Sequence, residues 1–203
     1  MARPVLVITA LVVISFILSF HVAFKVKAER EVLRGRIEPE LIFDDWDSTI
    51  AQRVKIYPIE SATSCNTIER NGVLVKRKNA KATVVISHGF MCDKFDAGFL
   101  RQLFPKDKLN FFTFDFRAHG ENSEGQCCTF GRDEVFDVVA AVEYIKSDPE
   151  LKNKPIIGYG FSMGAVASIE AQAQRPDLFD AMILDCPFDS TEKVICRGLE
   201  HMK

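Results

Sequence analysis

The sequence predicts an α/β fold in which helices cover both faces of a mostly parallel sheet. The apolar runs of the chain are short and continuous rather than alternating, which is typical of strands that are buried on both sides. These runs take turns with segments of helical periodicity, and such units join parallel strands through right-handed crossovers. The 203 residues are 47% hydrophobic and 27% charged, the balance of an ordinary globular protein.

The first strands are expected where the globular part of the chain begins. Residues 53–59 alternate between apolar and polar side chains and therefore predict a strand. Asn71-Gly72 is a turn signal, and residues 73–76 predict a strand directly after that turn. Residues 83–87, which read Thr-Val-Val-Ile-Ser, form the first run of the buried type.

The later elements alternate regularly between helix and strand. The predicted order is a helix around residues 95–103, a strand over 110–116, a helix over 135–145, a strand over 155–160, a helix over 163–173 and a strand over 181–185. The helices are recognised by apolar side chains three and four residues apart, and the strands by Val, Ile and Phe. No internal repeat interrupts this alternation.

A membrane segment is predicted ahead of the globular part. The run that begins at Val5 and ends at Phe24 has twenty residues and no Asp, Glu, Lys or Arg. At about 1.5 Å per residue, its length matches a hydrocarbon core of about 30 Å. We predict a transmembrane anchor over residues 1–26, a charged juxtamembrane stalk over 27–42 and the globular α/β domain over 43–203.

A cleaved signal peptide is the alternative interpretation, with Val26-Lys27-Ala28 as the cleavage site and an exported product. The apolar run exceeds the usual core of about 7–15 residues, which favours the anchor. Basic residues set the orientation, because one precedes the run and five follow it closely: Arg3, then Lys25, Lys27, Arg30, Arg34 and Arg36. The positive-inside rule therefore predicts a single-pass membrane protein with a cytoplasmic body.

Cysteine usage and net charge exclude several classes of protein. The six cysteines show neither a small-domain disulfide framework nor the paired spacing of a zinc site, so reduced thiols are expected. The formal net charge of −2 gives no broad nucleic-acid footprint. No cofactor motif and no metal motif occurs.

The most informative motif is Gly160-x-Ser162-x-Gly164, which follows a predicted strand and opens a predicted helix. The chain must turn from strand to helix in very few residues, and the two glycines have no Cβ to collide with their neighbours. Ser162 is then held in strained dihedral angles with Oγ above the sheet, near the positive end of the helix. We interpret Ser162 as a catalytic nucleophile; the alternative is a turn without chemistry.

A serine hydrolase also needs backbone N–H groups that stabilise the oxyanion. One donor is expected at Met163, the residue after the nucleophile. The other is expected at Phe90, in the loop that ends the 83–87 strand, where Gly89 allows a close approach. His88 precedes both in this loop, and we expect it to fix the turn rather than to act as acid or base.

These motifs together resemble the α/β-hydrolase superfamily over the chain from about Phe43 to its end. The segments that carry the resemblance are Ser87-His88-Gly89-Phe90, the loop from Asp115 to Ser123, Gly131-x-x-Glu134-x-x-Asp137 and Asp185-Cys186-Pro187-Phe188. With its predicted anchor, the chain is similar to membrane-anchored α/β-hydrolase-domain proteins and to serine aminopeptidase-like lipases. The resemblance implies that Asp115, Arg117 and His119 form a hydrogen-bonded structural network beside the site. Glu134 and Asp137 share a helix face, which we expect to be solvated or cap-like.

The resemblance implies a catalytic triad in the order serine, acid, histidine. Asp185 and Asp189 are candidate acids by position. The only histidine after Ser162 is His201, in a polar stretch unlike the expected loop after a late strand, so no base is assigned. We therefore expect a domain truncated at its C-terminus, with the last strands missing.

The predicted function is that of a membrane-anchored serine hydrolase without a cofactor. Its substrates would be carboxylic esters, thioesters or lipid acyl groups, with a peptidase as a further possibility. The alternatives are a non-catalytic α/β-hydrolase-like binding protein and an inactive truncated product.

Overall fold

A computed structural model of the chain describes residues 51–59, 69–105, 108–121, 125–194 and 196. The predicted anchor over 5–24, the predicted stalk and His201 lie outside these residues. Within them, no helix has both the length and the apolar character that a bilayer crossing requires.

The described residues belong to two compact units. The larger unit, Trp46–Asp189, contains every strand described below. In the smaller unit, the backbone N–H of Lys193 donates to Ser190 Oγ at 3.3 Å. A serine whose hydroxyl oxygen accepts the N–H of the third residue after it is typical of the start of a helical turn.

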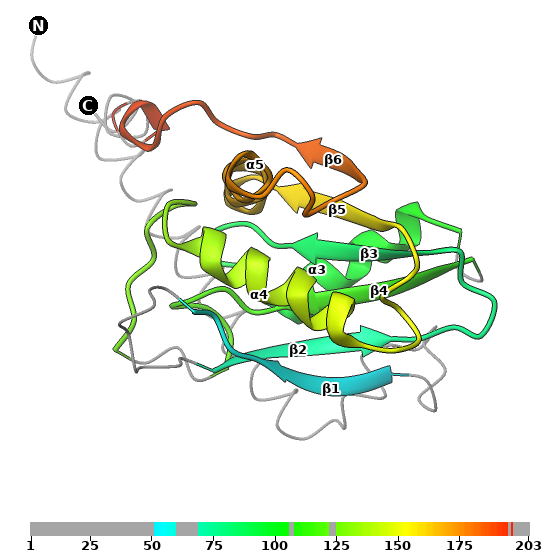
Figure 1. Cartoon of the computed structure of the whole chain (residues 1–203). Helices are drawn as coiled ribbons and strands as arrows, with labels where there is room; N and C mark the ends of the chain where they lie inside the picture. Colours follow the sequence, from blue (N-terminus) through cyan, green and yellow to red (C-terminus); the bar gives the residue numbers. More distant parts are fainter. Residues whose placement is uncertain (1–50, 60–68, 106–107, 122–124, 195, 197–203) are drawn as a thin grey trace, which may run out of the picture. The chain divides into compact units, whose positions relative to one another are not determined.

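Six strands of the larger unit form one sheet (Figure 1). They are β1 (Ala51–Ile56), β2 (Arg70–Val75), β3 (Ala82–Ser87), β4 (Leu109–Phe114), β5 (Ile156–Phe161) and β6 (Ala181–Asp185), and their order across the sheet is β1-β2-β4-β3-β5-β6. The four strands from β4 to β6 are parallel, whereas β1 and β2 pair antiparallel at one side. The prediction of a mostly parallel α/β sheet is confirmed.

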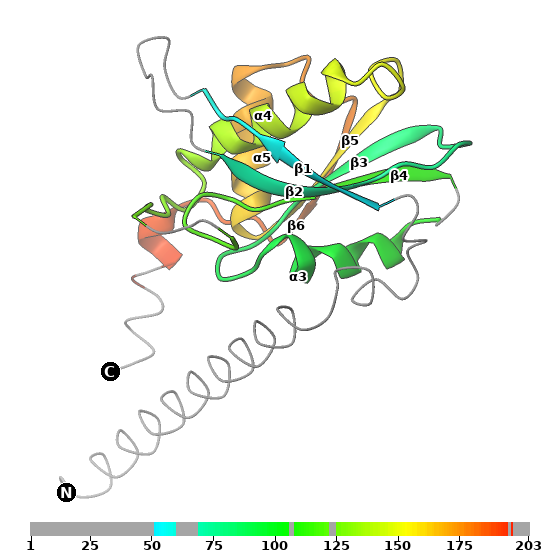
Figure 2. The ribbon, with the colours of Figure 1, turned by 90° about the horizontal axis from the view of Figure 1, so that it is seen from below.

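Helices lie on both faces of this sheet (Figure 2). They are α3 (Lys94–Gly98), the 3₁₀ helix η1 (Phe99–Leu103), α4 (Glu134–Ser147) and α5 (Met163–Gln174). Figure 2 shows α4 and α5 on one face and α3 on the other. Each successive pair of parallel strands is therefore joined through helix, as the alternating pattern predicted.

The core lies between α4, α5 and the central strands. Val138, Val142 and Ile145, spaced three and four apart on α4, are fully buried against Phe112 and Phe114 of β4. Burying each such side chain contributes about 1.5–3 kcal/mol relative to exposure. Because all six residues of β3 are buried, that strand has no polar face, and this explains its continuous apolar sequence.

The turn predicted at Asn71-Gly72 is wrong, because both residues lie inside β2. Gly72 pairs with Val54 on one side and Phe114 on the other. A Cβ at Gly72 would lie 2.7 Å from the Phe112 ring. The glycine therefore permits close packing of an aromatic side chain within the sheet, rather than a reversal of the chain.

Candidate active site

Ser162 lies between β5 and α5, at the end of the sheet where the parallel strands terminate. Its backbone has φ 51° and ψ −114°, a sparsely populated conformation that costs about 1–3 kcal/mol for a residue with a side chain. The Ser162 N–H donates to the Asp185 carbonyl at 2.8 Å, and the Ser162 carbonyl accepts from Ala165 and Val166 N–H. The strained serine is thus held from both β6 and α5.

Glycine is required on both sides of Ser162. A Cβ at Gly160 would lie 2.5 Å from Ala165 Cα, and a Cβ at Gly164 would lie 2.5 Å from the His88 carbonyl oxygen and against that of Ser87. The first turn of α5 is therefore pressed against β5 and against the loop that follows β3. This crowding is the reason that the motif needs glycine at both positions.

The loop after β3 is held in place by the His88 ring. Its Nδ1 donates to the Gly89 carbonyl at 2.7 Å, and its Nε2 accepts the Phe116 N–H at 2.9 Å. The side chain is fully buried, and burial lowers the pKa of His88 to about 3. His88 is neutral at physiological pH, and its two hydrogen bonds fix the tautomer that carries the proton on Nδ1.

The predicted oxyanion donors belong to two segments in contact. Gly89 precedes Phe90 in the sequence, and Phe161 precedes Ser162. A Cβ at Gly89 would lie 2.9 Å from the Phe161 ring. Met163 is the first residue of α5, so its N–H has no acceptor within the helix. The structure therefore brings the loop of Phe90 to the turn that carries Ser162 and Met163.

The candidate acids lie at the end of β6 and shortly after it. Asp185 is its last residue and is exposed, and its Oδ2 accepts a hydrogen bond from Tyr159 Oη at 3.1 Å. Asp189 is also exposed, four positions further along the chain. Of the four histidines in the sequence, the structure describes His88 and His119. The ring of His119 is buried, and its Nδ1 donates to the Arg117 carbonyl at 2.7 Å.

The loop after β4 is held by a buried lysine. Asp115 accepts hydrogen bonds from Lys94 Nζ at 2.7 Å and from the Lys94 N–H at 2.9 Å. Both side chains are 1% exposed, so little of this pair is screened by water. Because Lys94 begins α3, the pair ties the loops after β3 and β4 together. No role for Lys94 was predicted from the sequence.

A second buried charge cluster lies beneath the same loop. Asp137 of α4 binds the Arg117 guanidinium through Nε at 3.1 Å and Nη2 at 3.3 Å, and it also accepts the Arg117 N–H. Its other partner is Arg70 Nε, at 3.1 Å. The expectation of a solvated face is wrong for Asp137, which is fully buried between two arginines.

Glu134 is also fully buried, so a solvated face is wrong here too, whereas a cap-like role describes its contacts. Its carboxylate accepts the Thr129 and Gly131 N–H groups at 2.8 and 2.7 Å. Burial raises the pKa of Glu134, but these hydrogen bonds outweigh burial and leave its pKa below the ordinary value. The ionised carboxylate therefore orders the loop ahead of α4.

An apolar rim borders the site, formed by Phe90, Met91 and Phe130. Phe90 and Met91 are 45% and 49% exposed, and the Phe90 and Phe130 rings lie 4.7 Å apart. The residue after Phe130 packs closely on α5. A Cβ at that residue, Gly131, would lie 2.8 Å from the side chain of Val166. The rim therefore lies beside the helix that Ser162 opens.

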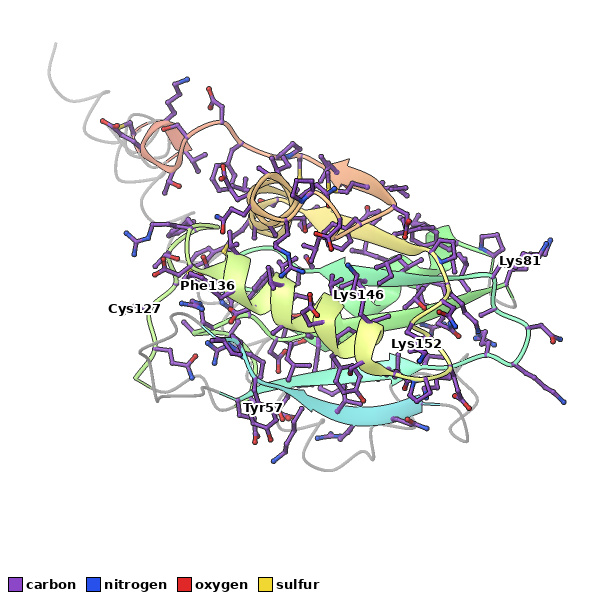
Figure 3. The ribbon with its side chains drawn as sticks, viewed as in Figure 1. Tyr57, Lys81, Cys127, Phe136, Lys146 and Lys152 are labelled. Atoms are coloured by element: carbon purple, nitrogen blue, oxygen red, sulfur yellow. The ribbon has the colours of Figure 1, made fainter. Side chains whose placement is uncertain are left out.

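The described thiols do not form disulfides or a metal site. All five cysteines in the described part of the chain are free, and Cys127 is exposed on the loop before α4 (Figure 3). Its neighbour Cys128 is partly buried, and burial raises the pKa of this thiol to about 11, so it stays protonated. Among the residues that the structure describes, no three His, Cys, Asp or Glu side chains are grouped to hold a metal ion.

Comparisons of sequence agree with this geometry. Residues 78–200 match the family model of serine aminopeptidase, S33. The chain is 35% identical over 112 residues to the monoglyceride lipase of Rattus norvegicus, a match that covers 53% of this chain and 35% of that protein. It is 28% identical over 159 residues to the alpha/beta hydrolase domain-containing protein aho-3 of Caenorhabditis elegans, covering 70% of this chain and 45% of that protein.

The fold is similar to that of the esterase Pf2001 from Pyrococcus furiosus. The TM-score is 0.62 at 26% identity, and the match covers 75% of this chain and 58% of the esterase. The chain spans less than half the length of the two curated relatives named above. The family match nevertheless covers more than half of this chain and includes the turn of Ser162. The chain belongs to the serine aminopeptidase S33 family of the α/β-hydrolase superfamily.

Proposed function

We propose that the protein is a serine hydrolase that cleaves carboxylic esters, thioesters or lipid acyl bonds through an acyl-enzyme at Ser162. One observation carries this proposal. Ser162 is held in a strained conformation, between two glycines that have no room for a Cβ, at the turn from β5 to α5. Strain of this kind persists where the surrounding structure enforces it, and it places a serine hydroxyl above the sheet for attack.

In the proposed reaction, Ser162 Oγ attacks the carbonyl carbon of the ester and loses its proton to a base. The N–H groups of Phe90 and Met163 stabilise the oxyanion as the tetrahedral intermediate forms. The carbon–oxygen bond to the alcohol then breaks, and the alcohol leaves with a proton. Water attacks the acyl-enzyme in the second half of the reaction and releases the acid and the free serine.

We assign the base to neither described histidine. Both ring nitrogens of His88 are occupied, and a pKa of about 3 makes it a poor proton acceptor at neutral pH. His119 is buried, with its Nδ1 bound to a backbone carbonyl. Without a base a serine hydroxyl is a weak nucleophile. These two observations favour a second candidate function, a non-catalytic binding protein built on the same fold.

The substrate class is supported by the apolar rim and by the relatives. Phe90, Met91 and Phe130 offer an apolar surface on loops near α5, the helix that Ser162 opens, and an acyl chain would gain about 25 cal/mol for each Å² buried there. The rat relative is named a monoglyceride lipase, and the Pyrococcus protein an esterase. Lipid acyl esters combine both features, because they present an ester bond next to a long hydrocarbon chain.

We further propose that residues 5–24 anchor the protein in a membrane, with the hydrolase unit on the cytoplasmic side. The twenty uncharged residues and the basic residues that follow them support this proposal. Extraction of membranes with alkaline carbonate is expected to leave the full chain in the pellet. Release into the supernatant would contradict the anchor, because an integral helix resists this treatment.

The nucleophile is tested by labelling the full chain with a fluorophosphonate probe. The wild type is expected to become labelled, with the adduct on the peptide that contains Ser162, and Ser162→Ala to lose at least about 99% of the label. Ser147→Ala is the matched control, because Ser147 is exposed and its Oγ donates only to the Tyr144 carbonyl of its own helix.

Two outcomes would reject the catalytic proposal. If the folded wild type takes no label, the non-catalytic function is the better account. If Ser162→Ala is labelled as fast as the wild type, the nucleophile is another residue. Circular dichroism of each variant shows whether a loss of label reflects a loss of structure.

A further inference from the structure

The end of β6 is hydrogen-bonded to the Ser162 turn at Asp185. Its backbone carbonyl accepts the Ser162 N–H at 2.8 Å, and its carboxylate accepts the Tyr159 hydroxyl at 3.1 Å. One residue therefore links the hydroxyl of a β5 side chain to the backbone of the strained serine. No role for Tyr159 was predicted from the sequence, because this residue lies in an apolar run.

Tyr159 is the fixed partner in this link. Its side chain is 4% exposed, its backbone pairs with Ile86 and Ile183 of the neighbouring strands, and the Phe104 ring meets it edge-on at 5.9 Å. Burial and the hydrogen bond to Asp185 raise the pKa of Tyr159, so the hydroxyl remains a proton donor at neutral pH. A rigid donor is thus available for a less constrained acceptor.

Asp185 is the less constrained partner. Among the described strands β6 pairs only with β5, and most of its residues are exposed. Cys186, which follows Asp185, has φ 45°, so the extended strand conformation ends there. The Asp185 backbone pairs with Phe161 on β5, and the Tyr159 hydroxyl is a further contact that fixes its side chain.

We infer that Tyr159 is a positioning residue, which acts through Asp185 to hold the backbone of Ser162 in its strained conformation. This inference rests on the proposed function of Ser162. The strained conformation is unfavourable by itself and must be maintained by its surroundings. Loss of one hydrogen bond is enough to change the population of the reactive conformation about two- to tenfold.

The same geometry gives Asp185 a role different from that of a triad acid. A triad acid acts through its negative charge, since it stabilises a protonated histidine. A positioning residue needs only an acceptor oxygen for the Tyr159 hydroxyl. Asparagine supplies that oxygen without the charge, and alanine supplies neither.

The inference is tested by the rate of fluorophosphonate labelling of the full chain, separated into a maximal rate and a half-saturating probe concentration. Tyr159→Phe and Asp185→Ala are each expected to lower the maximal rate about five- to tenfold, with the half-saturating concentration unchanged. Asp185→Asn is expected to stay within about twofold of the wild type. Tyr144→Phe is the matched control, because Tyr144 lies on α4 and its ring stacks on Phe112.

A second measurement does not depend on reactivity. Amide hydrogen exchange at Ser162 is expected to be about five- to tenfold faster in Tyr159→Phe than in the wild type, because the Asp185 carbonyl no longer has a fixed position. Exchange within β3 is expected to be unchanged. This measurement also applies to Tyr159→Phe if Asp185→Ala does not fold.

Each contrary result has a distinct meaning. Unchanged exchange at Ser162 in Tyr159→Phe overturns the positioning role, whether or not the protein is reactive. A labelling rate of Asp185→Asn as low as that of Asp185→Ala also overturns it, in favour of a charged acid. Absence of label on the wild type rejects the proposed hydrolase, and hydrogen exchange then decides the positioning role alone.

Discussion

Replacement of Asp137 by alanine is expected to lower the free energy of unfolding by about 3–5 kcal/mol. Asp137 is the shared partner of Arg70 and Arg117, whose side chains are 2% and 7% exposed. Removing the carboxylate takes away the counter-charge that two buried guanidinium groups share, although Asp133 still lies 3.9 Å from Arg117 Nη1. A cost of this size is a large part of the stability of an ordinary domain.

The loss at Asp137 is also expected to disturb the site. The carboxylate accepts the Arg117 N–H, and the Arg117 carbonyl in turn holds the His119 ring. Since Phe90 packs on His119 at 5.6 Å, displacement of this loop reaches the segment of the proposed oxyanion donor. We therefore expect weaker fluorophosphonate labelling as well as lower stability.

Asp177→Ala is the matched control for Asp137→Ala. The Asp177 side chain is 68% exposed, and its carboxylate lies 3.5 Å from Lys146 Nζ and from Arg175 Nε. Exposed ion pairs contribute about 0–1 kcal/mol, so this variant is expected to remain close to the wild type. Urea denaturation of both variants measures the difference. Similar losses for the two would contradict the buried role of Asp137.

The contrast between these aspartates shows what the sequence could reveal. The pattern at Glu134 and Asp137 predicted a shared helix face, and the two do share it. Which face is buried depends on Arg70, which is 67 positions away in the chain and arrives through β2. A local pattern carries no information about that partner, and charged residues on a helix are usually solvated. The prediction of a solvated face failed for this reason.

The strands and helices were easier to predict, because each is encoded by its own apolar pattern. The exception at Asn71-Gly72 has a physical cause. A glycine that makes a turn and a glycine that leaves room for an aromatic ring look identical in sequence, and only the packing of Phe112 distinguishes them. The role of Tyr159 was not predicted for a similar reason. A tyrosine in an apolar strand is expected to be a core residue, and the partner of its hydroxyl lies on another strand.

The position of the candidate site could be predicted further than its chemistry. Gly160, Ser162 and Gly164 lie close together in the chain, so their spacing alone indicated the sharp turn that the structure contains. The contact between Gly164 and the Ser87–His88 backbone joins segments that are distant in the chain, and no local pattern predicted it. The acid depends on segments distant in sequence, so Asp185 and Asp189 stay predictions, and no base was predicted.

Acidification is expected to destabilise the protein through His88. The ring is neutral in the folded state with a pKa of about 3, whereas a histidine in the unfolded chain has a pKa of about 6.5. Below pH 6.5 the unfolded state binds a proton that the folded state does not, so stability falls as the pH falls. Between pH 6.5 and pH 3 this one group removes roughly 5 kcal/mol of stability.

The physical cause is burial, which outweighs the opposing effect of the Nδ1 hydrogen bond to the Gly89 carbonyl, and the hydrogen bond at Nε2 favours the neutral ring as well. A proton on Nε2 would point at the Phe116 N–H, which this nitrogen accepts in the neutral form, so protonation replaces a hydrogen bond with a repulsion. His119, whose ring centroid lies 5.2 Å away, also disfavours a positive charge on His88. The stability that the neutral His88 ring contributes is fully present above pH 6.5.

His88→Gln separates this effect from the titration of carboxylates. The glutamine side chain can place an oxygen near the position of Nε2 and accept the Phe116 N–H, but it does not titrate. The variant is expected to be less stable than the wild type at pH 7.5, and to lose less stability between pH 6.5 and pH 4 in urea denaturation. If both proteins lose stability equally over this range, His88 is not the acid-sensitive group. Because His88 fixes the loop ahead of Phe90, a flatter profile for the variant would also identify this loop as the part of the candidate site that acid disrupts.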